Sequence, residues 1–189
     1  MKARPTIYNG IQMRSRLEAR VAAWLDVERI AWEYEPMAFA SPAGQYLPDF
    51  RLPDLDPSGR PTYLEVKPTS DEIGQVTRRL DIIRESDRHA NLALGVEPWL
   101  MMGILPMRIG SLPWQPCYLV RCPCGGLCIG DDHRPWDGRT MVYSTCHSCG
   151  DDAYRDPVYC DRLVRLPAWN ETPAAPRINL EAVLTAAAR

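Results

Sequence analysis

Four side chains in neighbouring segments have the types that metal-assisted hydrolysis requires. Asp49 lies in one apolar segment, and Glu65 and Lys67 are separated by one residue in the next. If both segments are strands, alternation puts Glu65 and Lys67 on one face, and pairing of the strands brings Asp49 to the same patch. Glu18, from an earlier helical segment, can approach the patch if that helix covers the same face.

Converging carboxylates repel one another and stay ionised together only around a cation. Their hard oxygen atoms suit Mg²⁺ or Mn²⁺, which keep bound water and accept phosphate oxygens. Such an ion activates water and neutralises charge on a phosphate, while Lys67 orients or deprotonates the attacking water. The residue types therefore predict phosphodiester hydrolysis, with Glu18, Asp49, Glu65 and Lys67 as catalytic residues and the three carboxylates as ligands of Mg²⁺ or Mn²⁺.

Apolar spacing and turn residues predict the elements that position these side chains. The expected order is a helix over 14–28, strands over 31–34, 46–52 and 61–67, a helix over 71–87 capped by Ser70, and a strand over 91–96. The helical crossover makes the last strand a candidate for parallel pairing with an earlier one. The expected fold class is α/β.

The order of Pro48-Asp49, then Glu65-Val66-Lys67 on the next strand, resembles the PD-(D/E)xK nucleases over roughly residues 8–97. The resemblance implies a restriction-endonuclease-like αβββαβ core, in which Glu18 stands where many members supply an additional acidic ligand. The segments around the motifs are similar to those of transposase-partner and phage-associated endonucleases. The resemblance implies a Mg²⁺-dependent endonuclease that acts on DNA.

Each of these residues also has a structural interpretation. Glu65 and Lys67 can form an ordinary ion pair on a strand face, and Glu18 can pair with Arg14 one helical turn earlier. Gln75 stands where some family members place a helper residue, but it can equally be an exposed helical glutamine. Four arginines of the second helix either follow a phosphate backbone or form its solvated face: Arg78, Arg79, Arg84 and Arg88.

Closely spaced cysteines form a second candidate site. Cys146 and Cys149 have the Cys-x-x-Cys spacing of a zinc knuckle, about twenty residues after a first group with Cys122 and Cys124. Tetrahedral thiolate sites of this kind hold structural Zn²⁺ and leave no open position for a substrate. The expected ligands are Cys122, Cys124, Cys146 and Cys149, with Cys128 and His147 as substitutes.

Alternatives to this zinc site stay open. The four thiols can be unligated core cysteines, as we expect for Cys117 and Cys160, or an open coordination position can make the cluster a zinc-dependent hydrolase. Between the knuckles, Arg134, Trp136 and Arg139 supply one aromatic and two positive groups that can reach nucleic acid.

Length and composition limit the number of domains and the kinds of partner. The 189 residues allow one main core and a small appendage, which we divide into a nuclease domain over 1–115, a zinc-ribbon module over 116–165, and a Pro-rich linker with a short helix over 166–189. The net charge of −2 does not by itself indicate a nucleic-acid partner. The sequence shows neither a long apolar run nor a secretory signal, so we expect a cytoplasmic protein without a membrane partner.

Two questions about partners remain open at this point. Cleavage of both DNA strands needs two reaction centres, so a homodimer or a transposase-like protein partner is compatible with the motif. The alternative function, from a different class, is a non-catalytic nucleic-acid-binding or protein-binding module that keeps a nuclease-like fold and a zinc ribbon.

Overall fold

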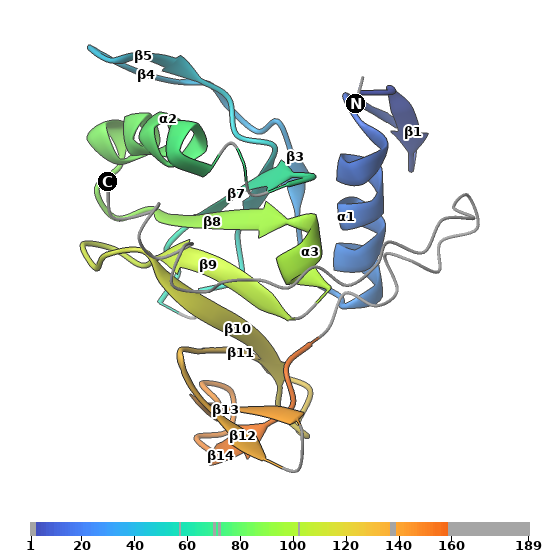
Figure 1. The fold of residues 1–189 in the computed structure, drawn as a ribbon, viewed down its shortest axis with the longest axis vertical. Helices are drawn as coiled ribbons and strands as arrows, with labels where there is room; N and C mark the ends of the chain where they lie inside the picture. Colours follow the sequence, from blue (N-terminus) through green and yellow to red (C-terminus); the bar gives the residue numbers. More distant parts are fainter. Residues whose placement is uncertain are drawn as a thin grey trace.

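The computed structural model describes residues 3–158 except 57, 70, 72, 102, 137 and 138 (Figure 1). The linker and helix expected over 166–189 lie outside the described residues, as do the Ser70 cap and Cys160.

Within the described residues, the largest sheet has seven strands: β3 (Glu33–Tyr34), β6 (Phe50–Leu52), β7 (Thr62–Lys67), β8 (Asn91–Val96), β9 (Ile104–Arg108), β10 (Gln115–Arg121) and β11 (Leu127–Gly130). Their order across the sheet is β11-β10-β9-β8-β7-β6-β3. Strands β7 and β8 pair in parallel, and the other neighbouring pairs are antiparallel. The α/β class and the parallel pairing of the 91–96 strand are therefore confirmed.

Two helices cover opposite faces of this sheet (Figure 1). Helix α1 (Arg16–Val27) packs Val21, Trp24 and Leu25 against the face that carries Leu64 and Val66. Helix α2 (Ile73–Ser86) packs its own apolar side against the other face, and a single turn, α3 (Glu97–Leu100), follows β8. Alternating residues of β7 thus point into two separate cores.

Smaller elements surround these layers. The hairpin β1 (Thr6–Tyr8) and β2 (Ile11–Met13) contacts α1, and the hairpin β4 (Phe39–Ser41) and β5 (Gly44–Tyr46) lies over α2. A three-stranded sheet of β12 (Asp132–Trp136), β13 (Arg139–Thr145) and β14 (Asp152–Arg155) lies beyond β11.

Several expected bounds were wrong. The strand expected over 46–52 is two elements, because β5 ends at Tyr46 and β6 begins at Phe50, with Asp49 in the connection between them. The two helices, expected over about 14–28 and 71–87, agree with the observed bounds to within two residues at each end. Strands β9 and β10 continue the main sheet through a region rich in Pro and Gly, so the sheet extends past residue 115, where β10 begins.

None of the helices in the described part of the chain is long and apolar enough to cross a membrane.

Candidate active site and metal centre

Asp49 is fixed beside β7 by a buried hydrogen bond. Cross-strand pairing of Arg51 with Tyr63 sets the register of β6 on β7, which brings Asp49, two residues earlier, alongside Glu65. The amide of Val66 donates to Asp49 Oδ2 over 2.8 Å, and Asp49 is 3% exposed. The position of this carboxylate is therefore set by the sheet itself.

Glu65 and Lys67 lie side by side on β7, as alternation predicted. Lys67 Nζ donates to Glu65 Oε1 over 2.7 Å. The Glu65 side chain is nearly fully buried, and its Oε2 atom has no hydrogen-bond partner among the described residues. A buried carboxylate oxygen without a partner is energetically costly and is suited to receiving a cation or a donor from outside.

Burial and the Glu65 carboxylate, with a smaller contribution from Glu18, raise the pKa of Asp49 to about 8, although the Val66 amide opposes the shift. Asp49 therefore ionises less readily than an ordinary carboxyl, and positive charge beside it favours its ionised form. A divalent cation would supply that charge, so the donor set fits Mg²⁺ or Mn²⁺.

Tyr46 is a neighbour of this centre that the sequence analysis missed. Its hydroxyl is buried, and burial together with the Glu65 and Asp49 carboxylates raises its pKa, whereas Arg79 acts in the opposite direction. The sequence carries no signal for this contact, because the contact depends on how β5 turns into the Asp49 connection.

Glu18 lies at the start of α1 and is 7% exposed. Ser15 Oγ donates to Glu18 Oε1 over 2.8 Å and accepts from the Glu18 amide, which makes Ser15 the N-cap of α1. Oε2 accepts hydrogen bonds from the Tyr34 hydroxyl at 2.6 Å and from the Arg14 amide at 3.1 Å. The Glu18 carboxylate is thus held at the start of its helix by Ser15 and Tyr34, and its contact with Arg14 involves the Arg14 backbone.

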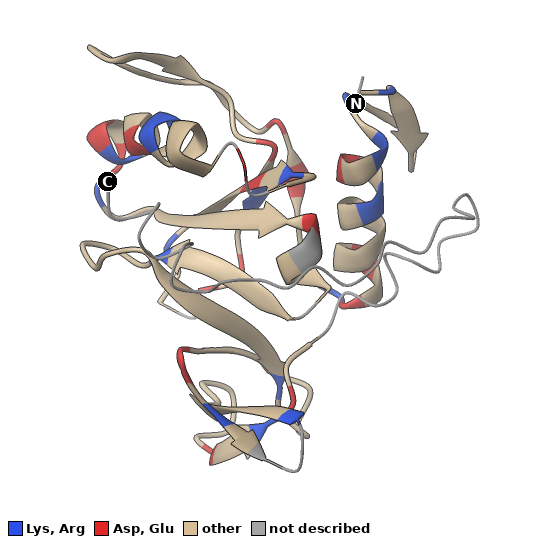
Figure 2. Cartoon of the chain, in the orientation of Figure 1, with Lys and Arg blue, Asp and Glu red and all other residues tan. Residues whose placement is uncertain are grey.

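The expected approach of Glu18 was wrong in one respect. Helix α1 covers the face of Leu64 and Val66, opposite to the face of Tyr63. Glu18 therefore reaches the neighbourhood of Asp49 around the end of the sheet rather than from above Glu65. We call Glu18, Asp49, Glu65 and Lys67 the acidic centre. Acidic and basic residues gather where β3, β7 and the first turns of α1 meet (Figure 2).

Arg14 links the acidic centre to β3. Its Nη2 atom lies 2.5 Å from Asp49 Oδ1, and its Nε atom lies 2.7 Å from Glu35 Oε1. The sequence analysis assigned Arg14 no role toward Asp49, which is 35 residues away in the chain.

The polar residues predicted on the second helix are mostly exposed to solvent. Gln75, Arg78, Arg79 and Arg88 all have exposed side chains, and Arg84 is half-buried. Of these, Arg79 is close enough to the centre to act on the pKa of Tyr46.

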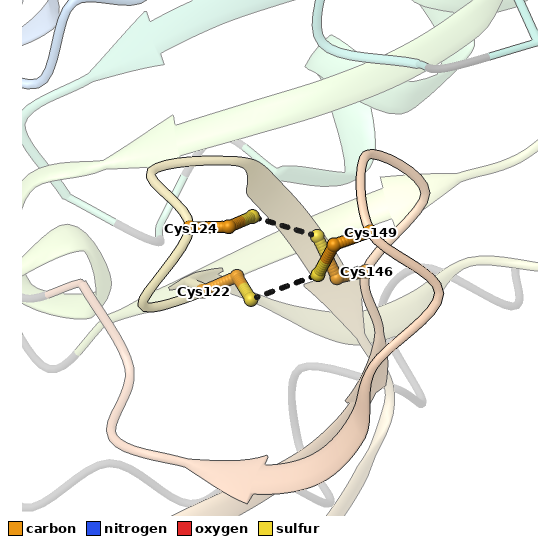
Figure 3. A group of neighbouring side chains, drawn as sticks. All are labelled: Cys122, Cys124, Cys146 and Cys149. Carbon is orange, nitrogen blue, oxygen red and sulfur yellow. Dashed lines mark hydrogen bonds between the residues drawn. The ribbon is translucent and has the colours of Figure 1, made fainter.

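The four cysteines expected to bind zinc come together (Figure 3). Their sulfur atoms all lie within 4.8 Å of one another, with 3.6 Å between Cys122 and Cys149 and 3.5 Å between Cys124 and Cys146. Sulfurs bound to a tetrahedral zinc ion at about 2.3 Å lie about 3.8 Å apart. The cluster, which we call the cysteine cluster, is therefore consistent with structural Zn²⁺.

The surroundings of the cysteine cluster fit the same ion. A Cβ atom at Gly126 would lie 3.0 Å from Cys146 Sγ and 2.8 Å from Ser148 Oγ, so only glycine leaves the cluster room. Burial raises the pKa of Cys146, but the amides of Cys149 and Ser148 outweigh it and bring the pKa to about 6. Backbone donors thus stabilise the thiolate that zinc requires.

A buried arginine also contacts the cluster. Arg155 is 7% exposed, and its Nη2 atom donates to Cys122 Sγ over 3.8 Å and to Asp151 Oδ2 over 2.6 Å. A zinc ion with four thiolates carries a net charge of −2, which this guanidinium partly offsets.

The alternative ligands lie outside the cluster. Cys128 is buried, its Sγ atom lies 3.9 Å from the Gly126 carbonyl oxygen, and burial raises its pKa to about 11. His147 is exposed, and Cys117 is buried in the core as expected.

The two candidate sites differ in compactness. In residues 3–158, apart from the six undescribed positions, the cysteine cluster is the only group of three or more His, Cys, Asp or Glu ligand atoms lying within 4.8 Å of one another. The ligand atoms of the three carboxylates in the acidic centre are therefore farther apart than the sulfurs of the cysteine cluster.

Comparisons of the chain with family models, with curated proteins and with solved structures found no match. The likeness to PD-(D/E)xK nucleases accordingly remains a prediction from the order and placement of a few residues.

Proposed function

We propose that the protein is a Mg²⁺- or Mn²⁺-dependent endonuclease of the PD-(D/E)xK kind that hydrolyses phosphodiester bonds in DNA. One observation carries the proposal: the Val66 amide holds Asp49 Oδ2 at 2.8 Å, on the same short strand segment where Glu65 and Lys67 pair at 2.7 Å. The Asp and the Glu-x-Lys segments thus meet in space although Asp49 and Glu65 are 16 positions apart in the sequence.

The chemistry of the donors favours a hard divalent cation. Asp49 and Glu65 are both nearly fully buried, and Glu65 Oε2 has an unfilled hydrogen-bonding capacity. Two carboxylates in a dry site ionise together only when positive charge balances them. When bound between them, Mg²⁺ would act as a Lewis acid toward a phosphate oxygen and lower the pKa of a bound water.

The chain's own groups have distinct tasks in this proposal. Asp49 and Glu65 hold the cation, and Glu18 adds a third carboxylate at the edge of the centre. Lys67, whose ammonium is already aligned by Glu65, orients the attacking water and balances the negative charge that develops on the phosphate. The buried hydroxyl of Tyr46 is a further polar group beside Glu65.

The zinc module takes no part in the reaction in this proposal. A closed set of four thiolates offers no position for a substrate, so the zinc holds the loops of the module together. A contact between this module and DNA is compatible with Arg134, which stacks on Tyr154 at 3.7 Å from the ring centroid.

A cleavage assay on zinc-loaded protein tests the proposal. Supercoiled, linear, single-stranded and branched DNA should each be incubated with Mg²⁺, Mn²⁺ or neither. We expect cleavage of at least one substrate that depends on the added cation. Lys67→Ala should reduce the rate by about 10³-fold or more while remaining folded.

Arg51→Met is the matched control, because Arg51 also pairs with a carboxylate, Glu33, but at the exposed edge of the sheet. It should cleave at the wild-type rate. Cleavage by Lys67→Ala at the rate of Arg51→Met would contradict the assigned chemistry.

A specific observation favours a second candidate, a non-catalytic binding module with a nuclease-like fold. Arg14 already balances Asp49, so the acidic centre does not depend on a metal for all its positive charge. Such a module would bind one zinc ion, show no change in melting temperature on addition of Mg²⁺ or Mn²⁺, and cleave no DNA.

A further inference from the structure

Arg14 is the exposed residue that reaches the most deeply buried carboxylate of the acidic centre. Its side chain is 54% exposed, whereas that of Asp49 is 4% exposed, and 2.5 Å separates Arg14 Nη2 from Asp49 Oδ1. The guanidinium therefore lies between solvent and this oxygen.

The two oxygens of Asp49 are not equivalent. Oδ2 is held by the buried Val66 amide, which belongs to the sheet and cannot leave without breaking it. Oδ1 is held by a half-exposed side chain that is not part of the sheet. A cation that binds Oδ1 therefore meets the Arg14 guanidinium at that oxygen.

Glu35 gives the displaced arginine a second attachment. Arg14 Nε lies 2.7 Å from Glu35 Oε1, and the Glu35 amide donates to the Asp49 carbonyl oxygen over 2.9 Å. Glu35 has a φ of 44°, a left-handed conformation that is unfavourable for a residue with a side chain. This turn places the Glu35 carboxylate beside Arg14, so the guanidinium stays at the opening of the centre when Asp49 releases it.

We propose that Arg14 and the divalent cation compete for Asp49 Oδ1, and that the displaced Arg14 then binds a phosphate of the substrate. The inference rests on the proposed function. Two cations cannot share one carboxylate oxygen without strong repulsion, so metal entry frees Arg14. A planar guanidinium next to a metal-bound phosphodiester is a suitable bidentate donor to its oxygens.

The competition is measurable without any cleavage. Zinc-loaded protein should be titrated with Mn²⁺ while the signal of free Mn²⁺ is followed by electron paramagnetic resonance. The Asp49→Asn variant lacks the carboxylate of this site, so the Mn²⁺ that it still binds is bound elsewhere on the protein. Because removal of the competing cation favours the metal, Arg14→Met should lower the Mn²⁺ dissociation constant about tenfold.

Two further variants separate direct competition from a general change in charge. Arg51→Met removes the same charge two residues after Asp49 and should change the dissociation constant by less than about twofold. Arg14→Lys keeps the charge but cannot span Asp49 and Glu35 with one planar group, so it should fall between wild type and Arg14→Met. Arg14→Lys also decides the outcome if Arg14→Met does not fold.

The substrate role has its own readout. At saturating metal, Arg14→Met should raise KM for DNA several-fold, with a smaller change in kcat.

The possible failures are distinguishable. If wild type and Asp49→Asn bind Mn²⁺ alike, the proposed function and the competition both fail. If they differ but Arg14→Met and Arg14→Lys bind Mn²⁺ like wild type, or Arg14→Met changes affinity no more than Arg51→Met, only the competition is overturned. An unchanged KM in Arg14→Met would overturn the phosphate contact.

Discussion

The cysteine cluster and the acidic centre are both candidate metal sites, but they are built in opposite ways. The cysteines come from two short loops within 28 residues of sequence, and their sulfurs already lie within 4.8 Å of one another. The acidic centre draws on α1, the connection before β6, and β7, and a protein cation, Arg14, occupies one of its ligand oxygens.

In the proposed function, this difference corresponds to two uses of a metal. A structural ion needs four ligands that are permanently in place and leave no coordination position open, which the four thiols of the cysteine cluster can provide. A catalytic ion must accept water and substrate, so its site keeps oxygens that can exchange partners. Asp49 shows this division within one side chain, because Oδ2 is fixed by the sheet and Oδ1 is held by a movable arginine.

The largest expected effect concerns the cysteine cluster. Cys146→Ala should abolish zinc binding and unfold the module around β12 to β14, because structural zinc contributes on the order of 10 kcal/mol to folding. Zinc content by elemental analysis and amide exchange in the module provide the measurement. Cys128→Ala is the control and should keep one zinc ion per chain. Loss of zinc from Cys128→Ala would mean that the ligands are wrongly assigned.

The acidic centre should instead make stability depend on pH. In the folded protein the pKa of Asp49 is about 8, above the ordinary value of 3.8. Between pH 3.8 and pH 8, the folded protein therefore binds a proton at Asp49 that the unfolded chain does not bind. The free energy of unfolding should therefore fall as the pH rises towards 8, by about 1.4 kcal/mol for each pH unit. Urea denaturation measures this slope. The assay uses zinc-loaded protein without Mg²⁺, at about pH 6.0, 6.75 and 7.5.

Asp49→Asn isolates the contribution of that one proton. The variant should lose most of the slope, and added Mg²⁺ should flatten it in the wild type, because a bound cation favours the ionised form of Asp49. Equal slopes in wild type and Asp49→Asn would show that other groups cause the pH dependence.

The smallest expected effect is on zinc affinity, and it compares a glycine packed against the cysteine cluster with a glycine in open space. Gly126→Ala pushes a methyl group against Cys146 Sγ and should weaken zinc binding by about 1 kcal/mol, since Ser148 can rotate away. Gly74→Ala, whose new Cβ meets nothing within 4 Å, should leave zinc binding unchanged. Competition with a coloured chelator measures both, and equal zinc affinities would rule out steric crowding at Gly126.

Local patterns predicted the cysteine cluster and β8 better than they predicted the rest of the sheet. The Cys-x-x-Cys spacing and the buried run of β8 each depend on neighbours in sequence, and both were confirmed. Strands β9 and β10 were missed because each contains a proline, which normally excludes a central strand. Pro106 and Pro116 pair with each other across these strands, an arrangement that depends on a partner distant in the fold.

Contacts around the acidic centre were unpredictable for a related reason. Alternation put Glu65 and Lys67 on one face, but the face that α1 covers depends on how the chain crosses the sheet. The bonds of Arg14 to Asp49 and Glu35 join segments that no periodicity connects.

The division of labour between the two metal sites is tested most directly by measuring DNA cleavage and bound zinc in the same samples. Zinc-loaded protein should be assayed on supercoiled plasmid with Mg²⁺ increasing from zero, with zinc per chain determined at each point. We predict that cleavage begins only with Mg²⁺ while zinc stays at one ion per chain. Cleavage without Mg²⁺, in proportion to bound zinc, would contradict the account.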